Sequence, residues 1–355
     1  MTTYKDSGVN VASGDAASKA AYTHAAATFA SRKGMVGEPV LEEDGYAGFL
    51  DMGDYALVMS DDSTGTKIDL ADHMKKFDTL GYDLLAMVAD DVVCTGAEVV
   101  AVSNCLDVPK VDEHMVDALL SGLSKACTEQ KIVIPAGEIA EVPGAVNRGV
   151  WSATALGVVQ KEKIIKPETI EVGDVVIALQ SHVARSNGFS LIRKILSDAF
   201  GEDWHNKEWK QGMSWGEVML SPSIVYHSAI LSLTGRYGEE RNVNVKGIAH
   251  ITGGGIPSKF RRILRKSGLG ARLTDLWPPH EALRDLIALG EVPIEEAYRT
   301  WNMGNGMLLV VAPKDVDASI SALKNEGIEA KKAGEITKDA TIVVEGFDGE
   351  ELRFS

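Results

Sequence analysis

Tyr55-Ala56-Leu57-Val58-Met59 is an apolar run that leads, two residues later, into the polar turn Asp62-Ser63-Thr64-Gly65-Thr66-Lys67. The run has the length and composition of a buried strand. The turn brings together a carboxylate, hydroxyl groups, backbone N–H groups and an ammonium, the groups that a nucleotide phosphate and its Mg²⁺ require. A Ser/Thr/Gly turn after a strand is more often only a turn, so this segment alone leaves both interpretations open.

Outside this segment, helical and extended patterns alternate along the chain. In the first half we expect strands over 55–60, 98–108, 131–136 and 150–160, and helices over 14–33, 79–95 and 112–129. In the second half we expect strands over 174–180, 246–251 and 307–311, helices over 188–199 and 314–326, a helix after the glycines at 253–255, and a final pair of strands. This alternation predicts an α/β protein.

The length of 355 residues exceeds what one hydrophobic core normally serves, so we expect two domains. The charged, proline-terminated stretch Lys161–Pro167 is typical of a junction and divides the chain into residues 1–165 and 166–355. Residues 201–215 combine tryptophans with mixed charge and show no clear period, which predicts a long surface excursion.

The composition excludes several classes of protein. A formal charge of −15 repels nucleic acid and anionic membranes, so any anionic ligand needs a local site. Cys94, Cys105 and Cys127 lack the spacing of a disulfide framework or a zinc site. The sequence has no secretion signal pattern and no apolar run of membrane-spanning length, so we expect a cytoplasmic protein with no membrane or nucleic-acid partner.

Asp91 interrupts an otherwise apolar helix face. At 100° per residue it falls about 20° from Leu80, inside the apolar arc, whereas Asp83 and Asp90 fall on one flank. A carboxylate in an apolar stripe is costly to bury unless it is paired or binds a metal. Asp91 is therefore either a satisfied structural acid or a site residue.

Glu138 and Glu141 follow the predicted strand over 131–136. Because α/β sheets bind ligands at the carboxyl ends of their strands, these acids are site candidates together with Asp62 and Asp91. The alternative is a solvated loop with two surface acids.

Two glycine-containing turns precede helices in the second half. Arg185-Ser186-Asn187-Gly188 offers free N–H groups and a forked cation to a phosphate, although Ser and Asn before a helix are also ordinary caps. Gly253-Gly254-Gly255 permits close approach of backbone to ligand, with domain packing as the alternative. No nucleophile-elbow, zinc-protease or P-loop motif occurs.

Taken together, these segments resemble the phosphoribosylformylglycinamidine cyclo-ligase family, also called aminoimidazole ribonucleotide synthetase. The matching motifs run in order from residue 4 to about residue 307: 4–10 (Y-K-D-A-G-V-D), 62–67 (D-G-V-G-T-K), 78–87 (D-T-I-G-I-D-L-V-A-M), 137–144 (G-E-T-A-E-M-P-G), 186–193 (S-N-G-Y-S-L-V-R), 249–255 and 302–304.

The resemblance implies a two-domain fold with mixed sheets of α+β type, N-terminal halves that pair in a homodimer, and an active-site cleft between the halves. It implies that ATP phosphorylates the amide oxygen of formylglycinamidine ribonucleotide, after which a ring nitrogen attacks and phosphate leaves. Asp62, Asp91 and Glu138 are then candidates for Mg²⁺, and these three acids with Lys67 for the catalytic set.

The other expected contacts fall into two groups. The resemblance gives Lys5 and Asp6, in a lid, and Ser63, Thr64, Gly65 and Thr66 as residues for ATP. It leaves two possibilities, the ribose phosphate of the ribonucleotide substrate or the cleft wall, for Arg185, Ser186, Asn187, Gly188, Gly253, Gly254 and Gly255.

The chain departs from the family pattern at a few positions. Ser63 and Thr64 replace Gly-Val, Ala136 and Ile139 replace a glycine and a threonine, Arg185 replaces the usual histidine, and Asp90 replaces asparagine. Since the acids and Lys67 remain, we interpret the chain as a divergent branch.

Two other functions stay open at this point. One is a small-molecule phosphotransferase resembling thiamine-monophosphate kinase or selenophosphate synthetase, although the latter's N-terminal cysteine is absent. The other is a nucleotide-binding protein without turnover. The segments at 4–10 and 186–193 favour the cyclo-ligase.

Overall fold

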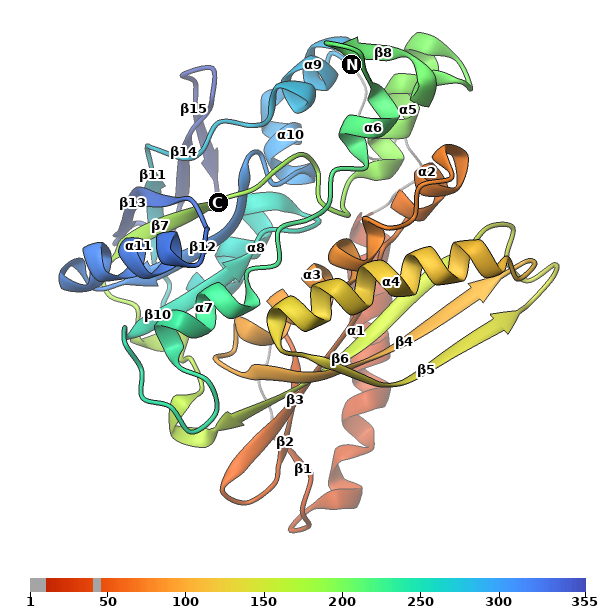
Figure 1. Ribbon diagram of the computed structural model, residues 1–355. Helices are drawn as coiled ribbons and strands as arrows, with labels where there is room; N and C mark the ends of the chain where they lie inside the picture. The colour runs from red at the N-terminus through yellow and green to blue at the C-terminus, as the bar shows by residue number, and fades with distance from the viewer. Residues whose placement is uncertain (1–10, 41–45) are drawn as a thin grey trace.

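The computed structural model describes residues 11–40 and 46–355, with backbone only for 11–16. Two separate mixed sheets divide the described chain, one before Lys161 and one after Asp174 (Figure 1). Lys5 and Asp6 lie outside the described residues. Within the described ranges, no helix is long and apolar enough to cross a membrane.

The first half contains a six-stranded sheet in the order β1-β2-β3-β6-β4-β5. Only β4 and β5 are parallel neighbours, and the other adjacent pairs are antiparallel. The strands are β1 Glu38–Val40, β2 Gly48–Asp51, β3 Tyr55–Ser63, β4 Glu98–Val108, β5 Val133–Glu141 and β6 Val150–Gln160.

Helices α3 and α4 pack together on one face of this sheet, the face toward the second half (Figure 1). They approach closely because Gly81 faces Gly122: a Cβ on Gly81 would lie 2.0 Å from the backbone nitrogen of Leu123. The helices of the first half are α1 Val11–Ala27, α2 Lys67–Met74, α3 Leu80–Val93 and α4 Glu113–Gln130, with a 3-10 turn at Phe29–Arg32.

The second half contains a seven-stranded sheet in the order β10-β12-β7-β13-β11-β14-β15. Its interior strand β7 sends Val176 and Ala178 into one hydrophobic cluster and Ile177 and Leu179 into another, so the sheet is covered on both faces. The strands are β7 Val175–Gln180, β10 Val245–His250, β11 Gly270–Leu273, β12 Asn305–Val311, β13 Ala330–Thr337, β14 Ile342–Glu345 and β15 Glu351–Phe354.

The helices of the second half flank this sheet. They are α5 Phe189–Phe200, α6 Trp215–Met219, α7 His227–Thr234, α8 Gly255–Leu264, α9 Glu281–Leu289, α10 Ile294–Thr300 and α11 Val316–Asn325. Short 3-10 turns lie at Lys161–Lys163, Pro167–Thr169, Trp204–Asn206 and Pro313–Asp315, and β8 Glu208–Lys210 and β9 Met213–Ser214 form a small hairpin.

The structure confirms the α/β alternation and corrects it in four places. Residues 201–215 are not a surface excursion throughout, because Trp204 and Trp215 are buried in the main core. Strand β5 continues to Glu141, so Glu138 and Glu141 lie within the strand instead of after it. The first helix ends at Ala27, and three strands, not two, follow α11.

Candidate functional site

The turn at 62–67 joins the end of β3 to the start of α2. Asp62 accepts a hydrogen bond from the backbone N–H of Ser63 (2.7 Å), and the N–H of Gly65 donates to the Ser63 hydroxyl (3.2 Å). Thr64 is fully buried, whereas Gly65 and Thr66 are exposed. Gly65 has φ +54°, a left-handed conformation that suits glycine at the tip of the turn.

Lys67, the last residue of the turn, points into the junction of the two halves. Its Nζ donates to Asp83 (2.8 Å) on α3 and to the backbone carbonyl of Ser221 (2.7 Å) in the second half. Both charged side chains are completely buried. Burial lowers the pKa of Lys67 and raises that of Asp83, while the charge of each partner opposes these changes.

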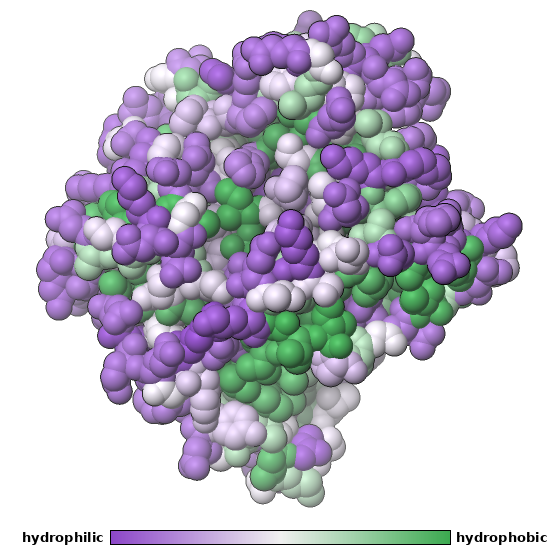
Figure 2. All heavy atoms as spheres, viewed as in Figure 1, coloured by the Kyte–Doolittle hydropathy of each residue, from purple (hydrophilic) through white to green (hydrophobic). Residues whose placement is uncertain are grey.

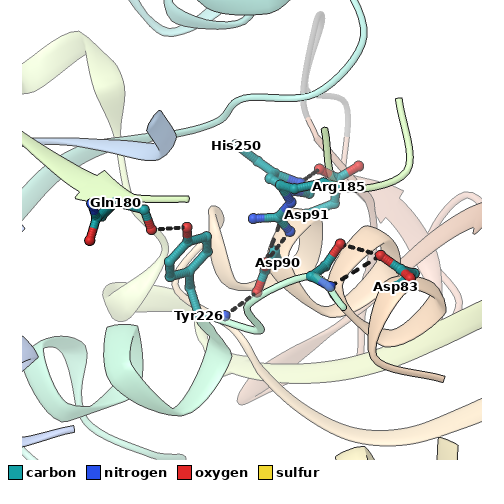
Figure 3. A network of polar contacts seen from close by, with 8 residues as sticks. Asp83, Asp90, Asp91, Gln180, Arg185, Tyr226 and His250 are labelled. Carbon is teal, nitrogen blue, oxygen red and sulfur yellow. Dashed lines mark hydrogen bonds and ion pairs between the residues drawn. The ribbon is translucent and has the colours of Figure 1, made fainter. Parts of the chain in front are cut away.

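A second buried ion pair lies two helical turns along α3. Arg185 donates through Nη2 to Asp90 (2.8 Å) and lies over the ring of Tyr226 at 5.1 Å (Figure 3). Asp90 also accepts from the backbone N–H of Tyr226 (2.9 Å), as Asp83 does from that of Ser223 (3.2 Å). Two acids of α3 thus hold Ser223 and Tyr226 of the second half, while Lys67 holds Ser221.

The acids of α3 differ in burial from what the helical arc predicts. Asp83 and Asp90, placed on the flank, are fully buried, whereas the Asp91 side chain is 20% exposed. The reason is that 12 of the 14 residues of α3 are buried, because the second half covers the flank that an isolated amphipathic helix would leave open.

Asp91 pairs with His250, at the end of β10. The His250 Nδ1 lies 2.7 Å from Asp91, and its Nε2 lies 4.0 Å from Asp90 (Figure 3). Burial raises the pKa of Asp62, and the negative charge of Asp91 adds to this effect while His250 and Lys259 oppose it. Asp62, Asp91, His250 and Lys259 therefore share one electrostatic environment.

Glu138 lies elsewhere, on the face of the first sheet opposite α3 and α4. It is paired in register with Cys105. Together with Asp61, Asp62 and Ser63 it lines a depression of about 490 Å³. Lys67 and Asp91 do not line this depression, and among the described residues no three His, Cys, Asp or Glu side chains are grouped closely enough to hold a metal ion.

The turn at 185–188 meets both the turn at 62–67 and the glycine run at 253–255. The position of a Cβ on Gly65 lies 3.6 Å from the carbonyl of Ser186, and that of Gly253 lies 3.6 Å from the Asn187 amide. Gly255 has a packing role, because a Cβ there would lie 1.9 Å from the carbonyl of Tyr298. A Cβ on Gly188 would lie 2.3 Å from the indole nitrogen of Trp301.

Several functional-site candidates were not identified from the sequence. His250 could have been noticed, since it stands three residues before the glycine run. The sequence gives no such signal for Asp83, Asp90 and Tyr226. Their importance comes from contacts between segments more than a hundred residues apart.

The chain is similar to proteins of one family. Residues 44–159 match the model of the AIR synthase related protein, N-terminal domain, and residues 171–346 match that of its C-terminal domain. The phosphoribosylformylglycinamidine cyclo-ligase of Thermococcus kodakarensis is 36% identical over 347 residues, which cover 98% of this chain and 99% of the relative.

Two solved structures share the fold. The hydrogenase maturation protein HypE in complex with ATP superposes with a TM-score of 0.59 at 17% identity, over 84% of each chain. PurL of T. maritima complexed with FGAR superposes with a TM-score of 0.56 at 14% identity, over 89% of this chain and 46% of PurL.

Proposed function

Since the chain belongs to the phosphoribosylformylglycinamidine cyclo-ligase family, we propose that the junction of its two halves is the active site for that family's reaction. The chain is an ATP-dependent ligase of purine biosynthesis that cyclises formylglycinamidine ribonucleotide to aminoimidazole ribonucleotide, with ADP and phosphate as the other products. In this proposal residues 1–165 bind ATP and residues 166–355 complete the cleft.

The observation that carries this location is a group of buried polar atoms without partners. Among the residues that the structure describes, they include Thr64 Oγ1, Ser186 Oγ, Asn187 Oδ1 and the Nε and Nη1 of Arg185. Buried polar groups are nearly always hydrogen-bonded in folded proteins, so these atoms indicate a polar ligand. We assign Arg185 to Gly188, with Gly253 and Gly254, to the ribonucleotide substrate.

ATP and Mg²⁺ fit the turn at 62–67. Mg²⁺ that is bound through nucleotide phosphates needs only one or two carboxylates from the protein, and Asp62 and Asp91 provide oxygen ligands in one electrostatic environment. The hydroxyls and N–H groups of residues 63–66 suit the phosphates. Glu138, in the depression that Asp62 also lines, is assigned to the nucleotide side of the site.

The protein's contribution to the reaction is positioning and electrostatics. Phosphorylating an amide oxygen turns it into a leaving group, which requires the γ-phosphate and the oxygen to be held in line. Bound Mg²⁺ would neutralise the developing phosphate charge. Lys67 fixes the end of the turn through Asp83 and Ser221, and His250 orients the Asp91 carboxylate.

The direct test is a coupled product assay. Purified protein given ATP, Mg²⁺ and formylglycinamidine ribonucleotide is expected to form ADP and aminoimidazole ribonucleotide in equal amounts, measured by chromatography and by colour formation from the aminoimidazole. ADP release that does not depend on this substrate, or that requires thiamine monophosphate, would contradict the assignment.

We propose a homodimer formed by the first halves. Met59 (40% exposed) and Val150 (46%) lie on the sheet face opposite α3 and α4, and Val133 (61%) lies on the edge strand β5. Figure 2 shows hydrophobic surface gathered in the lower part of the molecule, where Figure 1 places this sheet. Exposed apolar side chains that gather on one part of a surface are typical of an interface between subunits.

A charge on this face is expected to separate the subunits. Met59→Glu should shift the protein from dimer to monomer in light scattering, because burying an unpaired carboxylate is costly. Val172→Glu is the matched control, since Val172 is 58% exposed in the second half and should leave the dimer intact. A monomeric native protein, or a Met59→Glu dimer of unchanged affinity, would refute this interface.

We also propose a cytoplasmic location. The Cys94 and Cys127 thiols are free and buried, and Cys105 is free as well. Free thiols of this kind are normal in a reducing compartment.

A further inference from the structure

A second pocket, of about 390 Å³, opens between the two halves. Its first wall is α2 and the loop before β6, which contribute His73 and Arg148. Its second wall is α5 and the following turn, which contribute Arg193, Lys194, Glu202 and His205. We call this the Arg148 pocket.

Three cationic side chains line the Arg148 pocket, in a protein whose formal charge is −15. Arg148, Arg193 and Lys194 line it, with Glu202 as the single acid of the lining. The acids that pair with these cations lie outside the lining, on α2 and α5: Asp69 is 2.6 Å from Arg193 and 3.6 Å from Arg148, and Asp198 is 2.7 Å from Lys194.

These pairs leave donors available to a ligand. Arg193 uses Nη1 for Asp69, and a guanidinium has five N–H groups. The contacts of Arg148 with Asp69 (3.6 Å) and Asp72 (3.9 Å) are longer than hydrogen bonds. The Arg148 and Arg193 side chains are 43% and 39% exposed, so an anion can reach them from solvent.

The remaining lining adds neutral donors and a flat apolar wall. The rings of His73 and His205 lie 5.1 Å apart, and His205 packs edge-on against Trp204. The Ser190 and Ser197 hydroxyls complete the lining. Forked guanidinium groups, an ammonium and hydroxyls are the donors that recognise a phosphate monoester.

We propose that the Arg148 pocket binds a phosphate group carried by a small molecule. Its walls start at the two loops of the proposed active site: α2 begins at Lys67, and α5 begins directly after Gly188. A phosphate held by Arg148 and Arg193 therefore joins the loop before β6, which contacts α2 through Asp69 and Asp72, to the second turn of α5. The phosphate is either the ribose phosphate of the substrate itself or that of a separate ligand.

The test is calorimetric titration of the full chain with ribose 5-phosphate and, separately, with inorganic phosphate. Arg148→Gln and Arg193→Gln are each expected to weaken ribose 5-phosphate binding about tenfold, the loss of one charge-assisted hydrogen bond. Arg299→Gln is the matched control, because Arg299 is 48% exposed on α10 and should bind like the native protein. Arg148→Lys should recover part of the affinity, and circular dichroism checks that each variant is folded.

Two possible results identify the source of the phosphate, and both support the proposal that the Arg148 pocket binds it. If saturating formylglycinamidine ribonucleotide abolishes the titration and Arg148→Gln raises KM at unchanged kcat, the pocket holds the substrate's own phosphate. If the titration persists at saturating substrate, the ligand is separate. The proposal is overturned if ribose 5-phosphate fails to bind saturably, or binds the native protein, Arg148→Gln and Arg193→Gln equally. Because binding is measured without turnover, failure here leaves the assignment of the reaction intact.

Discussion

Asp90→Ala is expected to destabilise the protein by about 3–5 kcal/mol, the cost of leaving a buried charge without its partner. The substitution removes the carboxylate that pairs with Arg185, whose side chain is 1% exposed, and that accepts from the N–H of Tyr226. Urea denaturation followed by circular dichroism measures the loss as a lower midpoint.

A double-mutant cycle separates the lost pair from general disruption. Asp90→Asn combined with Arg185→Gln removes both charges, so the double variant should lose less stability than the two single variants lose together, with a coupling of at least about 2 kcal/mol. Lys75→Ala breaks an exposed pair with Asp72 and should leave the midpoint unchanged. Additive losses in the cycle would show that the pair does not act as a unit.

Asp91→Asn is expected to lower kcat by about a thousandfold with the fold intact, a loss of the size seen when a group that stabilises transition-state charge is removed. Asparagine keeps an oxygen that can accept from His250, so the substitution removes the charge and leaves the shape. Steady-state kinetics measure the loss, and the denaturation midpoint measures the stability.

The matched control for this substitution is Asp117→Asn, which changes an exposed acid on α4. It should leave kcat unchanged. If Asp91→Asn instead unfolds the chain, or retains native kcat, Asp91 is a structural acid whose role is to form the hydrogen bond with His250.

Much of the fold could be predicted because the residue pattern of each long strand is recognisable in the sequence. The expected bounds of β4 and β6 agree with the structure, since long strands with alternating burial are recognisable without their neighbours. The segment around Trp204 and Trp215 could not be placed in this way. Its tryptophans are buried by packing that the local sequence does not encode.

The candidate site was less accessible to sequence reasoning. The motifs identified the family, and that prediction is confirmed by the relatives. The assignments of Asp62, Asp91 and Glu138 stay predictions. The ion pair of Arg185 with Asp90 could not be predicted, because it joins residues 95 positions apart through a contact between the halves.

The interlocking of α3 with residues 221–226 has a mechanical consequence. Further along the junction, the buried His227 Nε2 accepts from the N–H of Val99, and Arg236 pairs with Glu98. Pulling the halves apart would break the buried Asp90–Arg185 pair and remove the Ser221 carbonyl from Lys67 in one event, so a hinge between the halves carries a high energetic cost. The two halves therefore behave as one stiff block around the proposed site.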